Sequence, residues 1–197
     1  SLTCDNAKIA RSRSAPGPQV AQSGVHDGPG AVLVSRPQIR ESDQRDQRAR
    51  VPERCLDLRD GLWVYGYGSL MWDPGVHFAE IRLAALDGHQ RRFNFQTSMA
   101  RGTVEQPALM LSLEARAGCC QGLAIHLAAE RAEAELEILW RREMIRGAYR
   151  PVMLPVATPQ GDISALVFTS NPSHPEYVGE LPLPDTAAII ARAAGVM

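Results

Sequence analysis

The sequence predicts an α+β fold, a sheet or barrel of about six to seven mixed strands with one long and one short helix. Short β-type segments dominate the chain from Gly61 onward. Turn-forming residues separate several of these segments, and only two stretches carry a helical pattern. The length of 197 residues suits one domain, or one domain with a tail.

Residues 1–58 differ in composition from the rest of the chain. Segments 11–18 and 40–48 are polar, charged and rich in turn formers, and only residues 31–34 have the composition to begin a strand. This region offers too little apolar surface to offset the conformational entropy lost on folding. We therefore expect a disordered polar arm over residues 1–58 and one domain over residues 59–197.

Seven segments of the expected domain have the length and composition of strands. They are residues 62–67, 81–86, 92–97, 108–113, 122–127, 151–158 and 165–169. A strong helical pattern covers Ala128 to about Ile145. A shorter helix is predicted from Asp185 to Ala194, with Asp185 as its N-cap and Gly195 just past its end.

Composition argues against several classes of function. The net charge is −1, so no strong field attracts nucleic acid or a membrane surface. No apolar run approaches the roughly 18 residues that a membrane helix needs. The four cysteines, which include the adjacent Cys119 and Cys120, lack the spacing of a zinc site or a redox pair. We expect free thiols in a reducing, cytoplasmic setting.

The long helix carries a carboxylate on its apolar side. On a helical wheel of about 100° per residue, one arc about 100° wide collects six residues, with Glu143 close to its centre. They are Ala129, Ala132, Leu136, Leu139, Trp140 and Glu143. The pattern predicts that most charged residues of the helix, among them Arg142, face water and that one faces the core.

A carboxylate among Leu and Trp loses hydration, which raises its pKa. A raised pKa suits Glu143 to accept and return a proton near neutral pH. The alternative is that Glu143, in the last turn of the helix, bends outward and pairs with Arg142 or Arg146.

A glycine-rich turn, Tyr65-Gly66-Tyr67-Gly68-Ser69, follows the first predicted strand. Glycines two residues apart permit positive φ and allow a ligand to approach the backbone N–H groups closely. Those donors and the Ser69 hydroxyl would suit a carboxylate or a developing oxyanion. No phosphate-binding glycine pattern follows, so a nucleotide site is not expected. The alternative is a bulge at the end of the strand.

Five motifs extend these two segments over most of the chain. They are Val64–Gly75, Gly88–Phe93, Arg101–Thr103, Trp140–Met144 with Gly147–Arg150, and Asn171–Pro172 through Tyr177–Gly179. In this order they resemble the γ-glutamylcyclotransferase superfamily, and specifically its ChaC-type branch, which acts on glutathione. The likeness covers residues 62–195, and five ordered motifs are more specific than any one of them.

The resemblance implies a mixed β-barrel with flanking helices, a pocket at the barrel mouth, and neither a metal nor an organic cofactor. It implies that Glu143 is the catalytic residue. The segment that binds the γ-glutamyl group maps to Val64, Tyr65, Gly66, Tyr67, Gly68 and Ser69. Tyr149, six residues after Glu143, either lines the pocket through its hydroxyl or packs as an ordinary aromatic side chain.

The reaction that the resemblance implies is cleavage of glutathione to 5-oxoproline and cysteinylglycine. The γ-glutamyl α-amine attacks its own amide carbonyl, and Glu143 serves as base and then as acid. Two alternatives stay open: a cyclotransferase for another γ-glutamyl amine, and a silent module that binds γ-glutamyl compounds. We expect glutathione as the small-molecule partner, no nucleic acid or membrane partner, and a monomer. Compared with the family pattern, the domain is shortened at its C-terminus.

Overall fold

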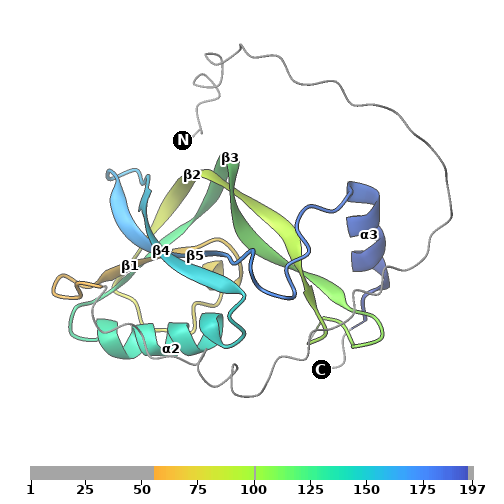
Figure 1. Cartoon of the computed structure of the whole chain (residues 1–197). Helices are drawn as coiled ribbons and strands as arrows, with labels where there is room; N and C mark the ends of the chain where they lie inside the picture. The colour runs from red at the N-terminus through yellow and green to blue at the C-terminus, as the bar shows by residue number, and fades with distance from the viewer. Residues whose placement is uncertain (1–55, 100, 195–197) are drawn as a thin grey trace, which may run out of the picture.

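Five strands form one curled, mixed sheet in the order β2-β3-β1-β5-β4 (Figure 1). The computed structural model describes residues 56–99 and 101–194. Its strands are β1 (Leu62–Gly66), β2 (Glu80–Thr97), β3 (Ala108–Leu127), β4 (Tyr149–Val156) and β5 (Ile163–Ser170). All neighbouring strands run antiparallel except β1 and β5, which are parallel. The α+β class is confirmed.

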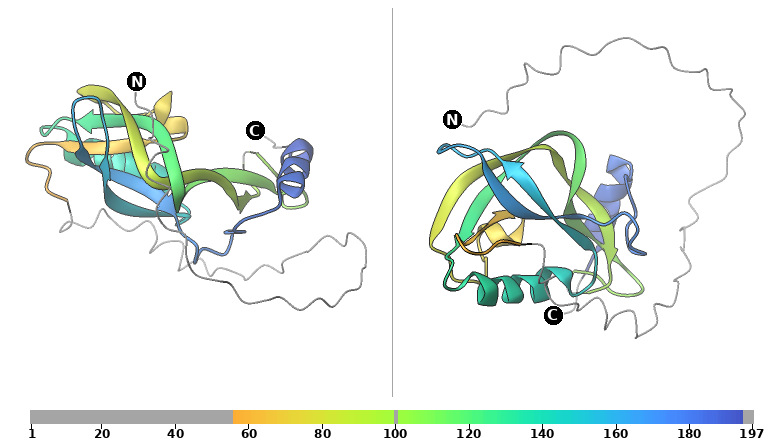
Figure 2. Two further views of the ribbon diagram at one scale, coloured as in Figure 1. Left: turned by 90° about the horizontal axis from the view of Figure 1, so that it is seen from above. Right: turned by 60° about the vertical axis from the view of Figure 1, so that its left-hand side comes forward.

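The sheet curls far enough for its two edges to touch at one point. Ala85 of β2 and Ala157, which follows β4, exchange two backbone hydrogen bonds of 2.9 Å each. Figure 2 shows the resulting half-barrel from two further directions. The curl gives the sheet an inner face, on which side chains from all its strands can meet.

The described residues contain five strands where the sequence predicts about six to seven. Predicted segments 81–86 and 92–97 both lie within β2, and segments 108–113 and 122–127 both lie within β3. The pairing of β2 with β3 shifts register between Asp87 and His89, where Gly88 has φ of +70°. Glycine accepts this positive φ, so the strand bulges and continues where the sequence pattern indicates a break.

Two α-helices accompany the sheet in the described part of the chain: α2 (Ala132–Met144) and α3 (Leu183–Arg192). The long helix begins four residues later than predicted, because residues 129–131 form a turn. The short helix begins before Asp185, with Pro182 as N-cap and Pro184 in its first turn. The fixed φ of proline suits a first helical turn, so the prediction of Asp185 as N-cap is wrong.

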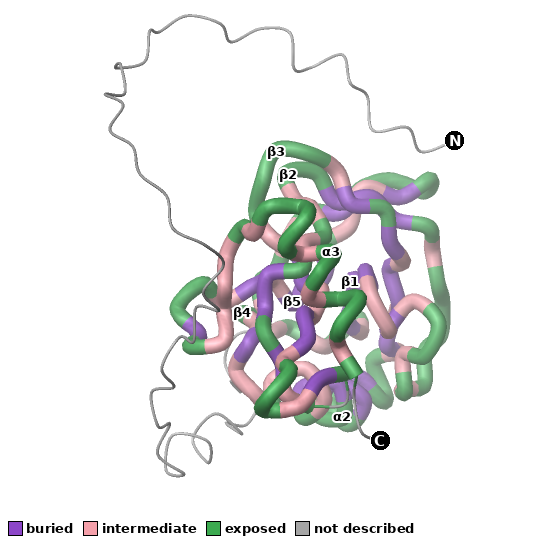
Figure 3. The backbone as a smooth tube through the Cα atoms, turned by 90° about the vertical axis from the view of Figure 1, so that its right-hand side faces the viewer, coloured by how far each residue is buried: buried purple, intermediate pink, exposed green. Residues whose placement is uncertain are grey.

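The core divides into two clusters, one on each face of the sheet. The first cluster lies between the sheet and α2 and includes Leu136, Leu139 and Trp140 of that helix. Trp140 meets Phe168 of β5 edge-on, with ring centroids 6.3 Å apart. The second cluster fills the inside of the curl around Tyr65 and Tyr67. Figure 3 shows buried backbone concentrated in the strands and α2, whereas α3 buries none of its residues.

The predicted arm lies outside the described residues except for its last three positions. Of these, Leu56 and Leu58 are half-buried against the first core cluster. Cys120 is a buried free thiol, but Cys119 is disulfide-bonded, so the expectation of free thiols is wrong at that residue. Within the described ranges, none of the helices has the length and apolar character to span a membrane.

Candidate active site

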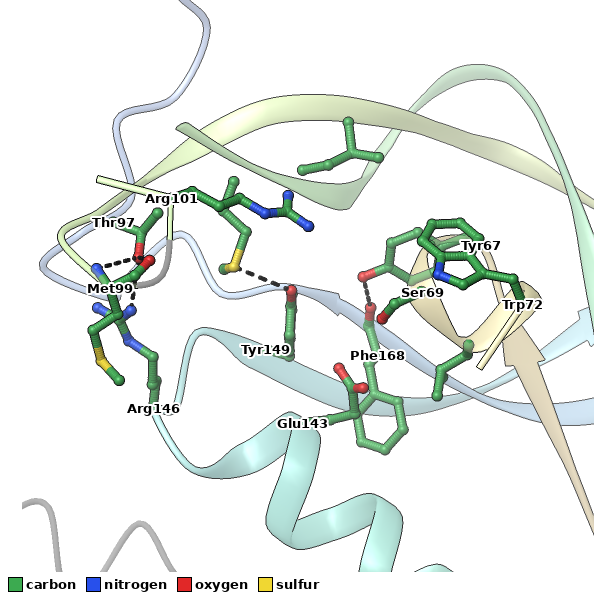
Figure 4. A pocket seen from close by; sticks show the side chains of 14 residues that line it. Tyr67, Ser69, Trp72, Thr97, Met99, Arg101, Glu143, Arg146, Tyr149 and Phe168 are labelled. Carbon is green, nitrogen blue, oxygen red and sulfur yellow. Dashed lines mark hydrogen bonds between the residues drawn. The ribbon is translucent and has the colours of Figure 1, made fainter. Parts of the chain in front are cut away.

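A pocket of about 350 Å³ opens where the turn after β1 faces the end of α2. The turn contributes Tyr67, Gly68 and Ser69, and the region around the end of α2 contributes Glu143 and Arg146 (Figure 4). Residues of β2 to β5 and of the loop after β2 complete the wall. The volume lies in the lower part of the range typical of small-molecule sites.

Glu143 is the acidic residue of this wall. The side chain retains 15% of its exposure, and its Oε1 lies 3.4 Å from Nε of Arg142. Burial raises the pKa of the Glu143 carboxyl above its ordinary value, and the nearby Arg142 charge opposes that rise. Both sequence-based interpretations therefore hold in part, since the carboxylate faces the pocket and still has an arginine beside it.

The turn ends in a short 3-10 helix, η2 (Ser69–Met71), with Gly68 before it. The N–H groups of Met71, Trp72 and Asp73 are bonded within the turn, to carbonyls of Gly68 and Ser69. Among the hydrogen bonds between described residues, the N–H groups of Gly68, Ser69 and Leu70 have no acceptor. The first N–H groups of a helix have no partner within that helix, so these donors remain for a ligand.

The glycines of the turn have different physical roles from the one predicted. Neither Gly66 nor Gly68 has a positive φ, so that part of the expectation is wrong. A Cβ at Gly66 would lie 3.1 Å from Cβ of Leu70, a tight contact that would push Leu70 of the turn away by a few tenths of an ångström. Nothing lies within 4 Å of the Cβ position at Gly68. That open space lets a ligand reach the backbone at Gly68.

Two arginines hold the turn in place. Arg91 of β2 donates from Nε to the Tyr67 carbonyl oxygen at 2.6 Å, and also bonds the Gln121 carbonyl. Arg142 of α2 donates to Ser69 Oγ and to the Asp73 carbonyl, each at 2.8 Å. The Tyr67 carbonyl and the Gly68 N–H share one planar trans peptide. The hydrogen bond from Arg91 therefore also fixes the direction of the Gly68 N–H, away from Arg91.

Two tyrosines lie on the pocket wall with Glu143. Tyr67 donates its hydroxyl proton to the Phe168 carbonyl at 2.8 Å, whereas the Tyr149 hydroxyl lies 3.8 Å from Met110 Sδ and close to the Tyr67 hydroxyl. Burial, with the Glu143 charge as a second cause, raises the pKa of Tyr149 to about 12, and burial also raises the pKa of Tyr67. Both hydroxyls thus stay protonated near neutral pH, and the long, weak contact of Tyr149 with Met110 Sδ can be exchanged for a hydrogen bond to a ligand.

Three residues of the predicted binding segment lie away from the pocket wall. Val64 and Tyr65 are fully buried, and the Tyr65 hydroxyl donates to the Cys120 carbonyl at 2.6 Å. Gly66 shapes the turn from behind, as its close approach to Leu70 shows. The structure brings together Tyr67, Gly68, Ser69, Glu143 and Tyr149, and places Val64, Tyr65 and Gly66 in the supporting strand.

The sequence analysis missed Arg142 and Glu135. The prediction that Arg142 faces water is wrong, because both ends of its guanidinium bond the turn. Glu135 is 2% exposed, pairs with Arg131 at 3.2 Å and accepts from the His77 N–H at 3.0 Å. The prediction of one core-facing charge is therefore also wrong, since α2 buries Glu135 and also turns the partly buried Glu143 inward. Glu135 falls just beside the apolar arc of the wheel, which is the one signal that the sequence gives for it.

A curled mixed sheet with a pocket of small-molecule size, as found here, also occurs in proteins of known structure. Similar architecture occurs in a solved structure described as a γ-glutamyl cyclotransferase specific to glutathione from yeast, with a TM-score of 0.62. The identity is 20%, and the match covers 69% of this chain and 80% of that one. At this identity the likeness shows the fold alone.

Residues 62–197 match the family model described as ChaC-like protein, and the chain belongs to this family. It is 37% identical over 155 residues to the glutathione-specific γ-glutamylcyclotransferase of Escherichia coli (strain K12). That match covers 78% of this chain and 67% of the relative. It is 32% identical over 148 residues to glutathione-specific γ-glutamylcyclotransferase 1 of Danio rerio, covering 73% of this chain and 76% of the relative.

Proposed function

We propose that this protein is a carbon–nitrogen lyase that cleaves glutathione to 5-oxoproline and cysteinylglycine. The names of its relatives support the substrate. The observation that carries the proposal is the desolvated Glu143 carboxylate, which shares one pocket with the unbonded N–H groups of the turn. An acid–base group and a set of fixed backbone donors are what the cyclisation of a γ-glutamyl amide needs.

Glu143 acts first as a base. The substrate α-amine is an ammonium group at neutral pH, and it cannot attack until it loses a proton. The ionised carboxylate takes that proton, and the raised pKa of Glu143 makes the transfer less unfavourable than it would be for an ordinary glutamate. The free amine then attacks the γ-carbonyl carbon of the same residue and closes a five-membered ring. The protein mainly holds the folded conformer, because nucleophile and electrophile belong to one molecule.

The turn supports the charge that develops during attack. As the new C–N bond forms, the carbonyl oxygen becomes an oxyanion, which accepts hydrogen bonds from the N–H groups at residues 68–70. Collapse of this intermediate breaks the original amide C–N bond. The protonated Glu143 gives its proton to the departing cysteinylglycine nitrogen. The restored carboxylate then takes the second proton of the attacking nitrogen and passes it to the freed amine. 5-oxoproline thus keeps one N–H, the dipeptide leaves as an ammonium, and Glu143 ends as a carboxylate.

Tyr67, Gly68, Ser69 and Tyr149 contact the substrate in this scheme. The Tyr149 hydroxyl donates to the γ-glutamyl group, since its bond to Met110 Sδ is weak and easily exchanged. Val64, Tyr65 and Gly66 act through the position of the turn. The monomeric state and the cytoplasmic setting stay predictions.

The product assay tests the proposal directly. The protein is incubated with glutathione, and 5-oxoproline and cysteinylglycine are measured by mass spectrometry. Glu143→Gln is expected to keep the fold and to reduce kcat by about 10²–10⁴-fold, the usual contribution of a general acid–base group. Glu137→Gln is the matched control, because it removes a carboxylate from the exposed side of the same helix.

Each result has a clear meaning. Full turnover by Glu143→Gln would refute the mechanism. Turnover of other γ-glutamyl amines, with none of glutathione, would identify a different cyclotransferase. Binding of γ-glutamyl compounds without any turnover would identify a silent binding module.

A further inference from the structure

The pocket has charges of opposite sign at two places. Glu143 supplies the negative charge, and Arg101, from the loop after β2, supplies a positive one. Figure 4 shows the Arg101 guanidinium extending over the pocket, with Tyr149 between it and Glu143. Burial is the main cause of the raised pKa of Tyr149; the Glu143 charge adds to the rise, and the charges of Arg101 and Arg146 oppose it. Arg101 therefore lines the pocket while its side chain stays exposed to solvent.

Arg101 differs from the other arginine of the wall in having its charge available. Arg146 forms an ion pair with Glu176 and donates to Thr97 Oγ1 at 2.9 Å, so its charge is already compensated. Within residues 56–99 and 101–194, no carboxylate lies within ion-pair distance of Arg101, and no hydrogen bond engages its guanidinium. An unpaired guanidinium at the rim of a pocket can bind a planar anion such as a carboxylate through two parallel hydrogen bonds.

The orientation of the substrate decides which anion this is. The proposed reaction places the α-amine at Glu143 and the γ-carbonyl at the turn. The α-carboxylate is bonded to the same carbon as the amine, so it lies at that end of the pocket. The departing dipeptide must then lie along the rest of the wall, which includes Tyr149 and the apolar side chains of Met99 and Met110. Its terminal carboxylate is the one anionic group that remains for the mouth of the pocket.

We propose that Arg101 binds the glycine carboxylate of glutathione and thereby selects γ-glutamyl peptides that end in a free carboxylate. This inference rests on the proposed function, because that function sets the orientation of the substrate. It assigns to the pocket a second subsite, separate from the γ-glutamyl subsite at the turn. The subsite makes the protein discriminate against γ-glutamyl amines that lack a terminal carboxylate.

A cycle of two proteins and two ligands tests the subsite by binding alone. Glutathione and its glycyl monoethyl ester are titrated calorimetrically into the Glu143→Gln protein, with and without Arg101→Gln. We expect Arg101→Gln to weaken the binding of glutathione about tenfold, the usual effect of losing a hydrogen-bonded charge that is partly open to solvent. The same substitution should change the affinity for the ester by no more than about twofold. Arg141→Gln, which removes an exposed arginine of α2, should change neither affinity.

Equal weakening of both ligands would overturn the subsite, because the partner of Arg101 would then be the α-carboxylate. Unchanged affinity for glutathione, or no measurable binding of it by the Glu143→Gln protein, would overturn it as well. In the protein that keeps Arg101, added salt should weaken the binding of glutathione more than the binding of the ester.

Turnover separates this inference from the proposed function. With Glu143 intact, Arg101→Gln should raise KM for glutathione about tenfold and leave kcat within about twofold. If the wild-type protein releases no 5-oxoproline from either compound, the proposed function fails, and the binding cycle still decides the subsite. If it cleaves both compounds with equal kcat/KM, the proposed function stands and the subsite is refuted.

Discussion

Replacing Arg91 with methionine tests whether the backbone donors of the turn are held in place from outside the pocket. Arg91 is not among the residues that line the pocket, yet it bonds the Tyr67 carbonyl at 2.6 Å and the Gln121 carbonyl. Methionine keeps much of the length of the side chain and removes both of these hydrogen bonds, together with a weak one to Met71 Sδ at 3.5 Å. The Tyr67–Gly68 peptide then becomes free to rotate, and the Gly68 N–H loses its fixed direction.

The expected effect on catalysis follows from the number of donors disturbed. Loss of one aligned oxyanion donor costs about 10²–10³-fold in kcat. A donor that is present but less well fixed should cost less, about 10–100-fold, which corresponds to about 1.4–2.7 kcal/mol of activation free energy. The free energy of unfolding should fall by about 1–2 kcal/mol, because two hydrogen bonds are lost and one of them is partly buried.

The adjacent Arg92→Met is the matched control. Arg92 forms an ion pair with Glu180 at 2.7 Å and has no bond to the turn. It should lower the melting temperature slightly and leave kcat unchanged. The assay is 5-oxoproline release over a range of glutathione concentrations, together with thermal unfolding of each variant. An Arg91→Met protein that is destabilised but retains the wild-type kcat would refute the positioning role.

Three further outcomes follow from the buried carboxylates of α2. Glu143 acts as an ionised base, and burial raises its pKa. As the pH drops, kcat/KM should therefore begin to fall at a pH above 4.5, the ordinary pKa of a glutamate. A profile that falls only below pH 4.5 would contradict this. The same raised pKa means that the folded state holds the proton more tightly than the unfolded state, so Glu143 lowers stability once the pH exceeds the unfolded pKa. Glu143→Gln should therefore unfold at a higher temperature than wild type at pH 7, and the difference should vanish near pH 4; a lower melting temperature at pH 7 would count against the burial. Glu135→Ala should lower the free energy of unfolding by about 1–3 kcal/mol, because it leaves the His77 N–H without its acceptor, while kcat stays unchanged; a large loss of kcat would instead assign Glu135 to the site.

The sequence pattern was sufficient to predict features that depend on one helix or strand alone. The apolar arc of residues 129–143 predicted which side of α2 meets the sheet: Leu136, Leu139 and Trp140 are buried there, whereas Ala129 is exposed in the turn before the helix. The same arc predicted that Glu143 faces inward. The first strand was predicted to within one residue, because an apolar run of strand length ends in glycine.

Contacts between distant segments decided the rest. Gly88 has the same sequence signal in a bulge as in a turn, and only pairing with β3 shows that the chain continues as β2. Pairing along a sheet is a long-range property, so composition alone counted too many strands.

The sequence by itself determined the chemical groups of this site: a glycine turn with backbone donors, and a glutamate on the apolar side of a helix. Only the tertiary structure decided which residues hold those groups in position. Arg142 reaches Asp73 across 69 positions of the chain, and Arg91 reaches Tyr67 across 24. The physical reason is that a hydrogen bond depends on distance and direction in space. Periodicity records only which face of an element is apolar, so such a bond leaves no trace in the pattern of either segment.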